Sequence, residues 1–204
     1  MKMIKKMKAS IATVFSVISF NGLAAESGIT HFSNCDASFF TAAANNPLLR
    51  TIPERLYSSD LKKDKKVKLD LHYTTPEGIE VSGFVVTYTD FDAYKEYTPM
   101  DVRGQFYYWG FTSTQPIETV VALMSKTLSL QKLDDENYVF NPMIRNEGSN
   151  WVKNNSAVTG ISPAEKTTEK VFLIEKADNQ TVEILCSLQG GVSQQDLYEA
   201  GVQK

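Results

Sequence analysis

The chain has little of what metal centres and nucleophilic active sites are built from. It contains two histidines, His31 and His72, and two cysteines among 204 residues. It has no HExxH or CxxC motif, and Asp90, Asp92 and Glu96 lack the spacing of a calcium-binding EF-hand loop. GxSxG motifs and glycine-rich phosphate loops are absent too. The sequence therefore predicts no catalytic residue of these classes, no metal and no cofactor.

The chain also lacks an apolar run of the roughly 20 residues that a membrane helix needs. The uncharged stretch 9–20 is shorter and follows a lysine-rich start. Leu23-Ala24-Ala25 suits cleavage by signal peptidase before Glu26. We therefore expect residues 1–25 to be a secretory signal peptide, and residues 26–204 to be a periplasmic or secreted protein with no membrane insertion.

Positive charge is scarce once this leader is removed. The full chain has 21 basic and 24 acidic residues, and the leader holds four of the lysines and no acid. The mature chain thus has a net charge of about −7. Nucleic acid and anionic lipid both require concentrated positive charge, so we expect neither as a partner. A basic protein partner agrees with this balance.

The two cysteines, Cys35 and Cys186, lie near opposite ends of the mature chain. In an oxidising compartment an even pair is most simply one intrachain disulfide. Two buried thiols or a bridge between chains are the alternatives. Neither cysteine has a histidine, lysine or CxxC partner close in sequence, so a catalytic thiol is not expected.

The periodicity of the mature chain predicts a single α+β domain. Val67, Leu69, Leu71 and Tyr73 alternate with polar residues, as in a half-buried strand, and the turn 75–78 leads into a second strand. Helices are predicted over 37–44, 53–57, 116–124 and 194–200, and strands over 67–74, 79–89, 104–112, 128–133, 137–140, 170–176 and 181–188. We expect a loose arm at 26–34, and a loop at 141–170 that hides one element within 150–158. The resulting fold is a mostly antiparallel sheet with helices packed on one face.

Aromatic residues are concentrated in one region. Nine lie between Tyr88 and Phe111, interleaved with acids. Along strand 104–112 Trp109 takes one face and Tyr108 the other, so at least one of these faces belongs to the core. The other face is either buried as well or exposed for recognition. On the second interpretation the binding residues are Asp90, Asp92, Tyr94, Tyr97, Tyr108 and Trp109.

These observations favour an exported, non-catalytic binding protein, of the kind that inhibits or confers immunity to a basic enzyme or toxin. The acids would steer such a partner and the aromatic rings would anchor it. One alternative is a cell-envelope hydrolase that uses paired carboxylates such as Asp90, Asp92 or Asp101. Another is an accessory subunit of an envelope assembly.

Overall fold

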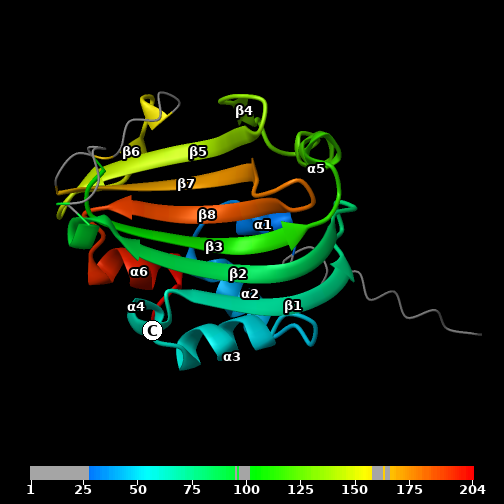
Figure 1. Ribbon diagram of the computed structural model, residues 1–204, viewed down its shortest axis with the longest axis horizontal. Helices are drawn as coiled ribbons and strands as arrows, with labels where there is room; N and C mark the ends of the chain where they lie inside the picture. The colour runs from blue at the N-terminus through cyan, green and yellow to red at the C-terminus, as the bar shows by residue number, and fades with distance from the viewer. Residues whose placement is uncertain (1–27, 95, 97–101, 158–162, 164–165) are drawn as a thin grey trace, which may run out of the picture.

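The computed structural model in Figure 1 describes residues 28–94, 96, 102–157, 163 and 166–204. The predicted signal peptide lies outside these residues. The helices are α1 (Ile29–Phe32), α2 (Ala37–Ala44), α3 (Thr51–Ser58), α4 (Leu61–Asp64), the 3-10 helix η1 (Phe91–Tyr94), α5 (Ile117–Met124) and α6 (Gln194–Ala200). The strands are β1 (Lys66–Thr74), β2 (Glu80–Asp90), β3 (Gln105–Ser113), β4 (Gln131–Lys132), β5 (Asn137–Asn146), β6 (Val152–Lys153), β7 (Thr167–Lys176) and β8 (Val182–Gly190). None of the helices in the described ranges has the length and apolar character that crossing a membrane requires.

The strands form one antiparallel sheet in the order β1-β2-β3-β8-β7-β5-β4, with β6 paired to β5. The hairpins β1–β2 and β7–β8 confirm the two predicted from alternation. At the centre β3 pairs with β8, which places Trp109 opposite Cys186. Figure 1 shows α1, α2 and α6 behind the sheet, so the predicted α+β fold with helices on one face is confirmed.

The face of the sheet toward the helices forms the core. Trp109 and Tyr107 of β3 are buried there together with a group of phenylalanines from helices and strands. These rings are Phe32, Phe39, Phe40, Phe84, Phe111 and Phe172. Their edge-to-face contacts join α1 and α2 to β2, β3 and β7.

Helix α1 corrects the expectation of a loose arm at residues 26–34. Ile29 and Phe32, about one turn apart, are 0% and 1% exposed. The carboxylate of Glu77, in the β1–β2 turn, accepts a hydrogen bond from the backbone N–H of Thr30 at 3.0 Å. A helix this short is not stable by itself, so burial and a distant carboxylate hold it in place.

The predicted disulfide between Cys35 and Cys186 is present, with the two Cα atoms 5.4 Å apart and 151 residues between them in sequence. Cys35 follows α1, and Cys186 is buried in the middle of β8. Beside this bond Phe32 packs edge-to-face on Phe111 of β3 and Phe172 of β7. Covalent and aromatic contacts thus fix the N-terminal helices to the centre of the sheet.

The helix caps agree with the local capping signals in the sequence. Asp36 accepts a backbone N–H at the start of α2, and Ser193 with Asp196 forms a reciprocal capping box on α6. Gly201 ends α6 in the left-handed conformation, with φ of 75°. Helix α3 begins two residues before Pro53, the predicted start. It tolerates this proline because the first turn of a helix leaves its N–H groups without intrahelical partners.

The segment predicted as a loop at 141–170 is largely strand. β5 continues through it past an irregularity at Asn141-Pro142, where Asn141 has φ of 47°. A left-handed residue followed by proline interrupts the alternation that reveals a strand in sequence. β6 confirms the element expected within 150–158, whereas β4 is two residues long instead of the predicted 128–133.

Arg145, near the end of β5, attaches α6 to the sheet. Its Nε donates to Asp196 Oδ1 at 2.7 Å, its Nη2 contacts the same carboxylate, and its Nη1 lies 3.1 Å from Glu199 Oε2. The guanidinium stacks on Trp151, 4.4 Å from the ring centroid. The side chains of Arg145 and Asp196 are only 12% and 2% exposed, so this is a buried ion pair.

Replacing both Cys35 and Cys186 by alanine should lower the free energy of unfolding by about 2–5 kcal/mol, because the unfolded chain loses a long covalent loop. Guanidinium denaturation followed by tryptophan fluorescence measures this. Wild-type protein held in reductant is the matched control and should unfold at the same midpoint as the double variant. A double variant as stable as the oxidised wild type would contradict the prediction.

Arg145→Ala should lower the free energy of unfolding by about 3–5 kcal/mol, because it leaves the Asp196 carboxylate buried without its cation. Urea denaturation measures the loss. Arg55→Ala, which removes an exposed arginine from α3, should stay within about 0.5 kcal/mol of wild type. Similar small losses for both variants would show that the buried pair is not what attaches α6.

Candidate functional site

Three of the predicted binding residues meet where β2 ends and η1 begins. Asp90 accepts the backbone N–H of Asp92 at 3.1 Å, and Asp92 accepts that of Gly104 at 3.2 Å. Tyr94, 41% exposed, accepts a hydrogen bond from Lys65 Nζ at 3.2 Å. The two carboxylates therefore shape this turn, and the tyrosine lies beside a lysine from the end of α4.

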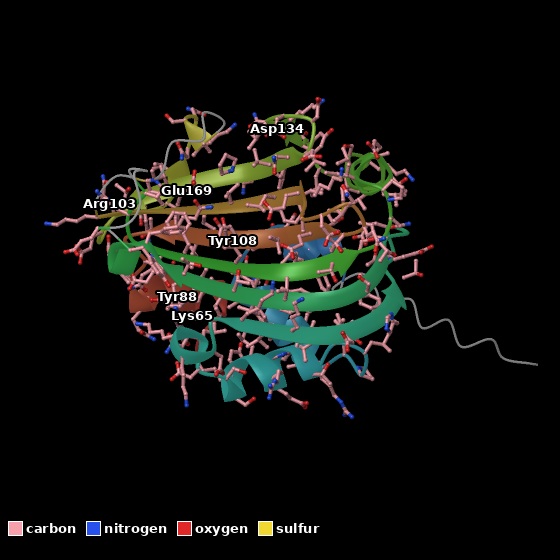
Figure 2. All side chains as sticks on the ribbon, viewed as in Figure 1. Lys65, Tyr88, Arg103, Tyr108, Asp134 and Glu169 are labelled. Carbon is pink, nitrogen blue, oxygen red and sulfur yellow. A yellow bond between two sulfur atoms is a disulfide. The ribbon has the colours of Figure 1, made fainter. Side chains whose placement is uncertain are left out.

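Asp90 and Tyr94 line a hollow of about 250 Å³ between α4 and β2. Lys62, Lys65 and Tyr88 complete much of its wall, and Figure 2 shows Lys65 and Tyr88 near each other. Burial raises the pKa of Tyr88, and the charge and hydrogen bonding of Asp90 raise it further. Because Lys62, Lys65 and Asp90 all line it, the hollow is mixed in charge.

The remaining predicted residues are separated from this hollow. Tyr97 lies outside the described residues. Trp109 is 1% exposed in the core, which corrects the expectation that its ring is offered to a partner. Its face of β3 is the one that the helices cover. Tyr108, the next residue back along the strand, points to the opposite face and is partly exposed.

That opposite face, called the open face here, carries Tyr108 near its centre (Figure 2). The described helices do not pack on it (Figure 1). Tyr108 lies between Thr87 of β2 and Ser187 of β8 in the strand register. The ring of Phe106 is 6.4 Å from Tyr108 and 4.8 Å from Phe91, between centroids. An aromatic row therefore runs across the open face toward η1.

Three carboxylates share the open face with this row. Glu175 of β7 lies directly opposite Glu183 of β8, an arrangement that brings Cβ atoms to about 5 Å. Neither carboxylate has a hydrogen bond or ion pair within the described part of the chain. Glu169, also on β7, is buried and accepts a hydrogen bond from Asn154 Nδ2 at 2.6 Å.

Burial raises the pKa of Tyr108 and of two of these glutamates. Burial raises the pKa of Glu175, and the charge of Glu183 raises it further. Burial also raises the pKa of Glu169, and this outweighs the opposing hydrogen bond from Asn154. The pKa of Tyr108 is raised first by burial and then by the charges of Glu175 and Glu169. Tyr108 therefore lies in the field of two carboxylates.

Two lysines of β1 lie on the same face as these acids. Lys66 and Lys68 belong to β1, which is three strands away from β8. At about 4.8 Å per strand, the backbones of β1 and β8 are roughly 14 Å apart. Hydrogen bonding by the backbone of Gln180 lowers the pKa of Asp178, in the turn between β7 and β8, and the charge of Lys68 nevertheless contributes to this shift. On the open face, β1 therefore carries Lys66, Lys68 and Asp70, whereas the acids over β7 and β8 are the three glutamates.

Glu169, Glu175 and Glu183 were not among the residues predicted from the sequence. Alternation offered a partial signal, since the predicted inward position of Cys186 directs Glu183 outward. Pairing it with Glu175 also requires the register of the β7–β8 hairpin, which places Lys176 opposite Val182. The amino-acid sequence alone does not show which residues of the two strands lie opposite each other.

Comparisons with protein-family models, curated proteins and solved structures give no match. Among the residues that the structure describes, no group of three or more histidine, cysteine, aspartate or glutamate side chains is arranged to hold a metal ion. The geometry and charge of the open face are therefore the basis on which a function can be assigned.

Glu175→Gln should raise the free energy of unfolding at pH 7 by about 0.2–1 kcal/mol, because it removes a like-charge pair. The pKa of Glu175 is higher in the folded protein than in the unfolded chain. Ionisation of Glu175 at neutral pH therefore lowers the free energy of unfolding. The gain should therefore shrink as the pH falls toward the unfolded pKa of about 4.3. Urea denaturation at pH 7 and pH 4 measures both values.

Glu80→Gln is the matched control, because Glu80 is exposed and lies opposite Thr74 instead of an acid. It should leave stability unchanged at pH 7. If Glu175→Gln is destabilising, or gains equally at both pH values, the two carboxylates do not repel each other in the folded protein.

Proposed function

We propose that the protein is an exported, non-catalytic binding protein whose open face docks on a basic protein. The observation that carries this is the opposition of Glu175 and Glu183 on a sheet face without helices. Like charges directly opposite in a sheet destabilise it. A lysine or arginine of a partner placed between the two would turn this repulsion into attraction, so binding would relieve a cost present in the free protein.

Tyr108 supplies the apolar part of such an interface. Its ring is partly exposed and continues into Phe106 and Phe91, while its hydroxyl lies in the field of the acids. Tyrosines at the centre of an interface commonly carry much of the binding energy. The net charge expected for the mature chain, about −7, would speed the approach of a basic partner.

An inhibitor or immunity-type role for a basic enzyme or toxin agrees with these features. The Cys35–Cys186 disulfide is compatible with a periplasmic or extracellular location. The hydrolase alternative has less support, because Asp90 and Asp92 accept backbone hydrogen bonds that shape η1. Asp101 lies outside the described residues.

The test uses the mature protein as bait in an extract of its own cells, followed by identification of the captured protein and calorimetry with the purified pair. We expect one stoichiometric basic protein. Glu175→Gln combined with Glu183→Gln should weaken its binding at least about tenfold, and Tyr108→Ala should do the same.

The matched control is Glu54→Gln with Glu118→Gln, which removes the same charge from exposed positions on α3 and α5. Its affinity should stay within about twofold of wild type at one salt concentration. Equal affinity for both double variants, or no stoichiometric partner in the extract, would refute the proposed function.

A further inference from the structure

An open cavity of about 410 Å³ lies on the helical side of the molecule, among α3, α4 and the segment that follows α6. Figure 1 shows these elements together around the end of the chain. The volume falls within the range of about 300–1,000 Å³ that is usual for small-molecule sites. This cavity has no part in the open face, so a ligand site in it is independent of the proposed function.

Apolar side chains form the floor of the cavity, and Ser59 and Gln203 add polar groups to its lining. Leu56 of α3, Leu197 of α6 and Val202 are buried side chains that line it, and the half-buried Leu61 of α4 faces them. Tyr107 reaches it from β3. Separate segments of the chain thus contribute carbon surface to one space, which suits an alkyl chain or a ring.

The tyrosines in the wall have their polar ends occupied. Tyr57 donates its hydroxyl hydrogen to the carbonyl of Gly201 at 3.0 Å, and Tyr107 donates to Gln105 Oε1 at 3.1 Å. The ammonium of Lys204 lies 4.5 Å from the centroid of the Tyr57 ring. Both hydroxyls being satisfied, the rings add carbon surface and a fixed shape instead of unpaired donors.

The rim of the cavity carries two lysines and one aspartate. Lys62 and Lys204 are exposed at its edge. Among the described residues that line it Asp60 is the one acid, and its carboxylate accepts the backbone N–H of Lys63 at 3.3 Å to cap α4. Lys62 also borders the neighbouring hollow, where Lys65 adds a further positive charge.

We infer that this cavity binds a small amphiphilic carboxylate. Its alkyl chain would lie against the half-buried Tyr57 and Leu61, above the buried floor of the cavity, and its carboxylate would be held by the ammonium groups of Lys62 and Lys204. A cationic amphiphile would meet repulsion at the same rim. A neutral alcohol of equal length would gain the apolar contact without the ionic one.

Decanoate, used below micelle-forming concentrations, is the probe. Calorimetry and two-dimensional NMR of the folded protein should show saturable binding of one molecule, with shifts centred on residues 56–62 and 197–204. Decan-1-ol should bind about three- to tenfold more weakly than decanoate, because it lacks the ionic contacts, and decyltrimethylammonium at least about tenfold more weakly. Equal affinity for decyltrimethylammonium, absence of saturable binding, or shifts centred elsewhere would overturn the inference.

Variants then test the rim. Lys62→Gln with Lys204→Gln should weaken decanoate binding about three- to tenfold, because two exposed charge contacts are lost. Lys63→Gln is the matched control, since it removes a charge from the same helix without lining the cavity. All three positions are exposed, so the thermal midpoint should not change. Equal affinity in the double variant and the control would refute the role of the rim.

Discussion

The disulfide between Cys35 and Cys186, together with the packing of Phe32 beside it, is the constraint on which the rest of the structure depends. The described helices span four to eight residues each, too few for stability in isolation. They persist because the disulfide and the phenylalanine cluster hold α1 and α2 against the central strands. The same contacts place the helices on one face of the sheet. The opposite face, the open face, is left without any of the described helices packed on it (Figure 1).

The covered face holds the main apolar core of the domain, whereas the open face combines buried apolar side chains such as Val85, Val171 and Leu185 with carboxylates. Glu175 and Glu183 oppose each other there, and Glu169 is buried near the other end of β7, where it pairs with Gln189. Such a pairing of acids lowers stability, and a cation supplied by a bound partner would offset that loss. The unfavourable pair thus gives the proposed docking surface its physical basis.

Strand β3 serves both sides of the molecule. Tyr107 points toward the helices and forms part of the cavity wall, whereas Tyr108 points to the open face. Successive residues of a strand face opposite directions, so one aromatic pair contributes to two separate surfaces. The aromatic concentration in the sequence is explained by this division: Trp109 and Tyr107 are core, and Tyr108 with Phe106 belongs to the other side.

Local patterns in the sequence were enough to determine the hairpins, the caps at Asp36 and Ser193, and the α+β class, because alternation and capping act within a few residues. The single cysteine pair also made the disulfide predictable. Only the tertiary structure decided that residues 29–32 form a helix, whose Thr30 N–H donates to Glu77. It also decided that β5 continues past Asn141-Pro142 and that Trp109 belongs to the core. It alone placed Glu175 opposite Glu183 and assembled the cavity from distant segments. Strand register and burial depend on contacts between residues far apart in the chain, and no local pattern encodes them.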